Sequence, residues 1–163
     1  MKKHELTDDT ITVGGRILHR IKALKSFSDV EEGDLGGYVE KEDNLDHSGE
    51  AWVSGDARVY GNARVYGNAW VSGDAWVYGD ARVSGDARVS GENDYAAAKG
   101  FGREYRTTTF FRLQDGGIGV RCGCFCGTLE EFREKVKETH KESKMGKEYL
   151  MLADLMEYKF KNA

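Results

Sequence analysis

The sequence contains no proline, only three cysteines and only four histidines among its 163 residues. All three cysteines fall within CGCFC, and an odd number so closely spaced cannot build a disulfide framework, which fits a reducing compartment. No apolar run approaches the roughly 18 residues of a spanning helix. The N-terminal MKKHELTDDT also lacks the apolar core of a signal peptide. These features predict a soluble, cytoplasmic protein without a membrane partner.

Positive charge is not in excess, because the formal net charge is −4. A mildly acidic chain has no broad electrostatic attraction to nucleic acid or to anionic membranes. The sequence also lacks a glycine-rich phosphate loop, a paired-carboxylate arrangement and a nucleophile elbow. We therefore expect no broad nucleic-acid binding and can name no catalytic residue.

Glycine, in contrast, is abundant and falls at a fixed spacing. Residues 51–92 repeat A-[WR]-V-[SY]-G-[DNE] seven times without interruption. Ala and Val are two residues apart, so on an extended segment they face one side, while the Trp/Arg and Tyr/Ser positions face the other. The Gly-[Asp/Asn] pair tolerates the left-handed backbone region that a corner uses. A short strand and a corner every six residues predict a coil rather than a hairpin sheet.

This pattern resembles the hexapeptide repeats of left-handed β-helices, in which an aliphatic residue and a small residue two positions earlier fill a triangular prism. In that family three sextets close one coil, so the resemblance implies that residues 18 apart stack. More degenerate copies precede the repeat, LDHSGE at 45–50 and VEKEDN at 39–44. If the phase is kept, His47 takes a Val position and should point into or near the core. Divergent terminal copies are typical of a capped repeat protein.

The predicted fold is mainly β, a left-handed parallel β-helix over residues 38–92 with a cap on either side. Residues 1–37 hold ITVGGRILHRIKAL, which predicts a strand or a hairpin turned at Gly14-Gly15, and then a glycine-rich acidic connector. Residues 93–163 are expected to form a small α+β module that closes one end of the coil.

The predicted α+β module has four elements. YRTTTFFRL and GIGVRCGCF read as two strands joined by the turn QDGG. A first helix should begin after Thr128, because Glu131 completes a capping box with it. A second helix is expected from about Lys147 to Phe160.

A second resemblance covers nearly the whole chain. The segment GDLGGYVEKEDNLDHSGEAWV, the AxVxG repeats, and the later TTTFFR and CGCFCGTLEEFREKVKETH look like uncharacterised proteins of bacteriophages and prophages. This resemblance implies a phage or prophage origin, and hence the cytoplasm of a bacterial host, but no settled activity.

Stacking at intervals of 18 residues assigns the outward side chains to three faces. Neighbouring coils would lie about 4.8 Å apart, close enough for aromatic and Arg side chains to form ladders. Trp76 and its neighbours make the densest cluster. The candidate ligand-binding residues are Arg58, Tyr60, Trp76, Tyr78, Trp52, Trp70, Arg64 and Arg82.

Two interpretations remain open for these faces. The side chains could cover the coil or lie in a subunit interface, since hexapeptide-repeat proteins that resemble this chain are very often trimers and interface cores are enriched in aromatic residues and Arg. Alternatively they hold a flat or anionic ligand, such as a nucleotide, by stacking and charge-assisted hydrogen bonds. A homo-oligomer, with a trimer favoured, is expected in either case.

No metal or other cofactor is expected from the sequence. The corner acids are explained as turn residues, because asparagines occupy the same position without charge at Asn62 and Asn68. Cys122, Cys124 and Cys126 should alternate on one strand and face inward, and C-x-C-x-C is not the usual spacing of a structural zinc site. A zinc site completed by His140 is the less favoured alternative.

The function expected from these features is that of a non-catalytic, oligomeric binding protein. The phage resemblance implies action against host defence, by sequestering a nucleotide-like signal or by binding a defence protein. An acyltransferase is the alternative, because many hexapeptide-repeat proteins use a His as general base, although His47 is expected near the core. A purely structural rod is a third interpretation, which the expected C-terminal cap disfavours.

Overall fold

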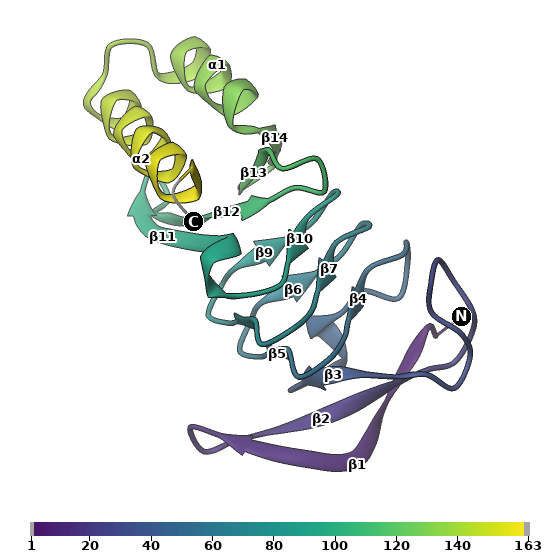
Figure 1. Cartoon of the computed structure of the whole chain (residues 1–163). Helices are drawn as coiled ribbons and strands as arrows, with labels where there is room; N and C mark the ends of the chain where they lie inside the picture. The colour runs from purple at the N-terminus through teal and green to yellow at the C-terminus, as the bar shows by residue number, and fades with distance from the viewer. Residues whose placement is uncertain (1, 162–163) are drawn as a thin grey trace.

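The computed structural model describes residues 2–161. It shows a stack of short parallel strands, which we call the repeat coil, between an N-terminal hairpin and a C-terminal sheet covered by two helices (Figure 1). Within residues 2–161 no helix combines the length and the apolar character needed to cross a membrane.

The repeat coil consists of two-residue strands. They are β4 (Trp52–Val53), β5 (Arg58–Val59), β6 (Arg64–Val65), β7 (Trp70–Val71), β8 (Trp76–Val77), β9 (Arg82–Val83) and β10 (Arg88–Val89). All of them pair in parallel: β4, β7 and β10 form one sheet, β5 pairs with β8, and β6 pairs with β9. Three strands therefore complete one coil, and residues 18 apart stack as expected.

The interior of the repeat coil is built from the Ala and Val of each sextet. Every such Ala from Ala51 to Ala87, and every Val from Val53 to Val89, is at most 1% exposed. Each corner glycine from Gly49 to Gly85 has φ between +61° and +69°, a region in which a Cβ is penalised. The predicted assignment of the alternating faces and of the corner glycines is confirmed.

The first coil departs from the expected phase. Val39 pairs with Val59, and Leu45 forms a bridge with Val65, so these pairs are 20 residues apart instead of 18. The buried Leu45, and not His47, fills the inward position, because it is the apolar member of LDH. The regular spacing is restored at Glu50. His47 lies half-buried in the enlarged corner between Leu45 and Glu50. His47, which was predicted to point into or near the core, therefore does not enter the core and lies beside it, stacked on the buried His4.

The N-terminal hairpin extends one face of the coil. Strands β1 (His4–Val13) and β2 (Arg16–Ala23) pair antiparallel around Gly14-Gly15, as predicted. Strand β3 (Leu35–Val39) pairs antiparallel with β2 and parallel with β5, which gives the sheet order β1-β2-β3-β5-β8. The segment predicted as a connector thus contains a strand. The absence of a side chain at Gly36 lets this strand lie close to the coil, because a Cβ there would overlap the carbonyl oxygen of Val53.

Two short 3₁₀ turns flank the regular coil, η1 (Glu42–Asn44) and η2 (Glu92–Asp94). Beyond η2 the chain forms a four-stranded antiparallel sheet and two helices. The strands are β11 (Tyr95–Phe101), β12 (Arg106–Arg112), β13 (Ile118–Cys122) and β14 (Phe125–Thr128), and the helices are α1 (Leu129–His140) and α2 (Lys144–Lys161). The β12–β13 hairpin and the capping box at the start of α1 are confirmed. Strand β11 was not predicted, and α2 begins at Lys144 rather than near Lys147.

Strand β12 joins the two hydrophobic cores. Alternate residues of a strand face opposite sides, so Phe111 packs into the interior of the repeat coil while Phe110 packs beneath α1 and α2. The backbone N–H of Gln114 donates to the carbonyl of Asp86 over 2.9 Å. The C-terminal sheet therefore covers the last coil, as the sequence led us to expect.

The three cysteines do not share one strand. Gly123 has φ +57°, so the chain reverses there and Cys122 pairs with Phe125 across a tight hairpin. Cys122 is half-buried on β13, whereas Cys124 in the turn and Cys126 on β14 are exposed. The prediction of one strand with three inward cysteines was wrong, because the glycine between them takes the left-handed conformation of a turn.

Candidate functional site

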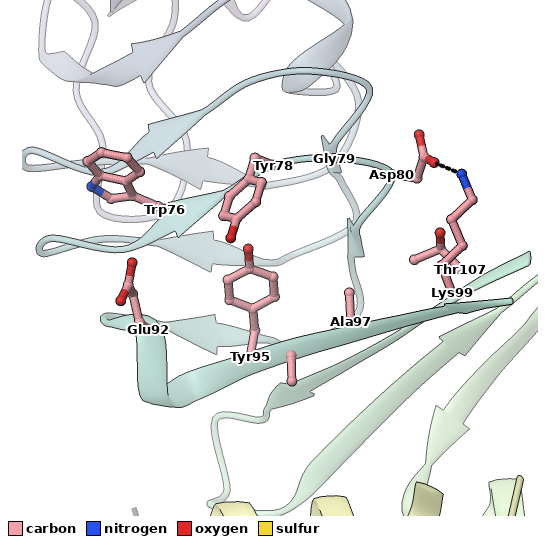
Figure 2. Close-up of a pocket in the computed structure, with 10 residues that line it drawn as sticks. Trp76, Tyr78, Gly79, Asp80, Glu92, Tyr95, Ala97, Lys99 and Thr107 are labelled. Carbon is pink, nitrogen blue, oxygen red and sulfur yellow. Dashed lines mark hydrogen bonds and ion pairs between the residues drawn. The ribbon is translucent and has the colours of Figure 1, made fainter. Parts of the chain in front are cut away.

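An open pocket of about 560 Å³ lies where the coil containing β8 meets β11. Trp76 and Tyr78 line it from the repeat, and Tyr95 lines it from the start of β11. In Figure 2, Trp76 stands at one end and the hydroxyls of Tyr78 and Tyr95 point toward each other in the middle. The ion pair between Asp80 and Lys99 lies at the other end. The pocket therefore presents aromatic rings along one half.

The rings are supported from the preceding coil. Tyr60 stacks on Tyr78 with centroids 5.4 Å apart and an angle of 10° between the planes. The Arg58 guanidinium lies 4.8 Å from the centroid of the Trp76 ring, because strand register places these residues directly above one another. Tyr78 remains 50% exposed. A ligand can therefore reach a ring whose position is already fixed.

Burial raises the pKa of two phenols in this cluster, those of Tyr95 and Tyr60. For Tyr95, burial is the largest cause of the raised pKa, and proximity to Tyr78 acts in the same direction. A neutral phenol is both a hydrogen-bond donor and an acceptor. These phenols thus offer polar groups between the aromatic surfaces without adding negative charge, and the carboxylate of Glu92 lines the same pocket near Trp76 (Figure 2).

A second open pocket, of about 520 Å³, adjoins the first and shares Asp80, Lys99 and Thr107 with it. Its lining carries four cations and the single carboxylate of Asp80. The cations are Arg82, Lys99, Arg106 and Arg121. We call the two pockets together the aromatic–basic groove, because one end is lined by Trp and Tyr and the other has a net positive lining.

The cations of the groove differ in how far they are already neutralised. Lys99 donates to Asp80 over 3.0 Å, and this bond, with one from Asn62, lowers the pKa of Asp80. Within residues 2–161 the Arg82 guanidinium makes no hydrogen bond or ion pair. The Nε of Arg121 is buried without a hydrogen-bond partner in the same part of the chain, and its guanidinium lies 5.4 Å from the Tyr66 ring centroid. The exposed Arg82 guanidinium thus retains its donors for an anion, and Arg121 adds a positive charge beside it.

A comparison with protein families finds a match only within the repeat. Residues 57–73 and 63–79 match the family model described as YdcK beta solenoid repeat. The repeat coil is of the β-solenoid type. The two matches overlap and run from β5 to β8, so they include part of the groove wall and none of the C-terminal sheet. A search of curated proteins found no match.

The residues predicted from the sequence divide between the groove and the rest of the solenoid. Trp76, Tyr78 and Arg82 line the groove, and Arg58 and Tyr60 support it from the coil beneath. Whether any of them binds a ligand stays a prediction.

The remaining three predicted residues lie elsewhere on the solenoid. Trp52 is 2% exposed because the ring of Phe27 packs edge-on against it at 5.4 Å, so its predicted exposure was wrong. Trp70 is half-buried on the same face as Trp52, one coil further on. Arg64 lies over the Tyr66 ring and lines a separate small pocket. The structure therefore does not bring these three into the groove.

Sequence reasoning missed the half of the groove that comes from outside the repeat. Tyr95 and Lys99 lie on β11, Arg106 begins β12, and Arg121 lies on β13. No spacing relates these residues to the sextets, since they reach the groove only because the C-terminal sheet docks on the last coil. The only signal in the sequence was their residue type, since one is aromatic and three are cationic.

A second group of chemically active side chains lies at the other end of the solenoid. The backbone N–H of Lys3 donates to Nδ1 of His47 over 3.0 Å, and Nε2 of His47 lies 2.8 Å from Glu42. Both ring nitrogens are therefore engaged, which does not favour His47 as the free general base of an acyltransferase. The His4 ring stacks on His47 at 4.2 Å, and burial lowers the pKa of His4 to about 4, so the ring is neutral at pH 7.

Proposed function

We propose that this protein is a non-catalytic binding protein that holds a nucleotide-like anion in the aromatic–basic groove. The observation that supports this most directly is that the pocket lined by Trp76 and Tyr95 shares three wall residues with the pocket lined by Arg82 and Arg121. A nucleotide likewise has two neighbouring parts, because its base is flat and aromatic and its phosphate is anionic. Stacking and charge-assisted hydrogen bonds therefore act on two parts of one ligand.

The size and energetics of the groove suit such a ligand. Each pocket falls within the roughly 300–1,000 Å³ range of small-molecule sites. Stacking of a base on an aromatic side chain contributes about 1–3 kcal/mol, and a hydrogen bond to a charged group about 1.5–3 kcal/mol. Within residues 2–161 no histidine lines either pocket. Binding without turnover is the simplest use of these groups.

The proposal extends to the family and setting of the protein. We propose that the β-solenoid winds as a left-handed parallel β-helix of the hexapeptide type, and that the protein forms a homotrimer. Support comes from the A-[WR]-V-[SY]-G-[DNE] repeat, from its three strands per coil, and from its ladders of aromatic and Arg side chains. The resemblance to phage proteins supports action in the bacterial cytoplasm against host defence. Sequestering a nucleotide signal is favoured over binding a defence protein, because the groove has the dimensions of a small ligand.

Isothermal titration calorimetry with a panel of nucleosides, nucleotides, cyclic dinucleotides and coenzyme A tests the proposal. A phosphorylated member should bind at least about tenfold more tightly than its nucleoside, because only the phosphate reaches the basic half. Trp76→Ala and Arg82→Ala should each weaken that binding by about tenfold or more, as expected from the loss of one stacking or one charged contact.

Two matched variants control for general damage to the solenoid. Trp70→Ala removes a Trp from the same sextet position on another face, and Arg88→Ala removes the Arg that pairs in register with Trp70 on that face. Both should leave binding unchanged. Equal binding of nucleoside and nucleotide, or equal losses in the control variants, would refute the assignment. Selective binding of coenzyme A alone would favour the acyltransferase alternative, and oligomer formation with no small ligand would favour the structural one.

A further inference from the structure

The enlarged corner of the first coil brings together side chains from distant parts of the sequence. His4 begins β1, Glu42 begins η1, and His47 lies in the corner where the two extra residues are accommodated. Their ligating atoms all lie within 4.8 Å of one another. Glu42 Oε2 is 2.8 Å from Nε2 of His47 and 3.8 Å from Nε2 of His4. This group, which we call the corner triad, is at the opposite end of the solenoid from β11 and the groove (Figure 1).

His4 is the unexplained member of the corner triad. Its side chain is 0% exposed, and neither ring nitrogen has a hydrogen-bond partner within residues 2–161. Leaving a buried polar group without a hydrogen bond carries a free-energy penalty. A hydrophobic residue would fill the same volume without this penalty. The His4 ring therefore keeps a nitrogen lone pair that no donor satisfies, and its Nε2 lies 3.8 Å from the Glu42 carboxylate, beyond hydrogen-bond distance.

We propose that the corner triad is a binding site for a divalent transition metal, with Zn²⁺ as the ion that fits best. Two imidazole nitrogens and one carboxylate make a donor set that zinc accepts, with a fourth position left for water. Calcium and magnesium prefer sites built from oxygen ligands and are disfavoured by the two imidazoles. The Glu42 side chain is 40% exposed and that of His47 is 30% exposed, so an ion can enter from solvent while His4 closes the inner side.

Binding requires two local changes. The stacked rings of His4 and His47 lie only 14° from parallel, so they must tilt relative to each other before a nitrogen lone pair of each can point at one ion. The second change is a proton shift within His47. The Lys3 N–H donates to Nδ1 of His47, so the neutral ring carries its proton on Nε2, facing Glu42. To ligate through Nε2, the ring takes its other tautomer, with the proton on Nδ1, and no net proton is released by His47. The Lys3 hydrogen bond is then given up. In exchange, the ion ties the first strand of the chain to the first coil.

Titration of untagged, metal-free protein with Co²⁺ and Zn²⁺ tests the site directly. Wild-type protein should bind one ion per chain, with the intense visible absorption of a four-coordinate Co²⁺ site that Zn²⁺ then bleaches. Glu42→Gln and His47→Gln each remove a ligand and should weaken binding by at least about tenfold, since even loss of an outer-shell partner costs about 10–100-fold. Both positions are partly exposed, so the variants are expected to fold, which circular dichroism checks.

His140→Gln is the matched control, because His140 lies at the end of α1, outside the corner triad. It should bind Co²⁺ as the wild type does. Zn²⁺ should also raise the melting temperature of the wild type and of this control, but not of His47→Gln, because an ion that binds only the folded state stabilises it. The backbone amide of Lys3 should shift in nuclear magnetic resonance spectra as its acceptor is lost. Absence of stoichiometric binding by the wild type, or equal affinity in all variants, would overturn the proposal.

Discussion

Two glycines at the same sextet position test the stacking of the coils, because they differ only in what lies above them. Gly73 has φ +61° and Gly85 has φ +63°. A Cβ on Gly73 would overlap the carbonyl oxygen of Ser90 in the next coil, whereas no atom lies within 4 Å of a Cβ on Gly85. Replacement by Ala adds the penalty of the left-handed region, about 1–2 kcal/mol, at both positions. A smaller gain of about 0.4–1 kcal/mol from the unfolded chain offsets part of it in both.

Gly73→Ala must in addition displace the backbone of the last coil. Overpacking of this kind costs about 1–3 kcal/mol, so Gly73→Ala should be about 2 kcal/mol less stable than Gly85→Ala. For a domain of this size the difference corresponds to roughly 4–8 °C in melting temperature. Thermal and urea unfolding of the two variants, followed by circular dichroism, provide the measurement. Equal destabilisation of the two would mean that the coils do not stack in the register described.

Two further predictions concern the junction between the solenoid and the C-terminal sheet. Phe111→Ala should lower the free energy of unfolding by about 3–5 kcal/mol, because it leaves a cavity at the end of the solenoid interior that Phe111 fills. Urea unfolding provides the measurement. A loss of less than about 1 kcal/mol would mean that the sheet does not cover that end. For Asp94, burial raises the carboxyl pKa, but hydrogen bonds from Ser90 and Arg112 outweigh burial and lower it below 3.8. Because the folded-state pKa is the lower one, its contribution to stability is complete above about pH 4 and is lost as the pH falls through the lowered pKa. Asp94→Asn should therefore be less stable than wild type at pH 7 and show a smaller loss below pH 4, and parallel acid-unfolding curves would contradict this.

The regular part of the fold was predictable because each sextet contains the residues that determine its own strand and corner. Ala and Val two residues apart specify the buried face, and glycine specifies the left-handed corner. The irregular parts depend on which of several neighbouring residues is buried, and the repeat pattern does not determine that. Leu45 displaces His47 from the interior because it is apolar, and this shifts the register by two residues. Gly123 turns a strand that the spacing of the cysteines had suggested was continuous.

The candidate site was predictable only where the repeat contributes to it. Trp76 and Tyr78 are outward residues of one sextet and Arg82 of the next, so the periodicity already placed them on the surface. Tyr95 and Arg121 reach the groove through the docking of the C-terminal sheet, a long-range contact without a local sequence signal. The same applies to the corner triad, whose ligands come from β1 and from an enlarged corner that alternation alone does not reveal.

The central claim, that the aromatic–basic groove holds a nucleotide-like anion, is tested most directly by native mass spectrometry of protein purified gently from bacterial cells. Wild-type protein, or protein given a nucleotide panel, should retain one small anionic aromatic molecule per groove, released by mild denaturation, while Trp76→Ala assembles in the same way without it. A wild-type assembly that carries no such mass and retains no member of the panel would contradict the account.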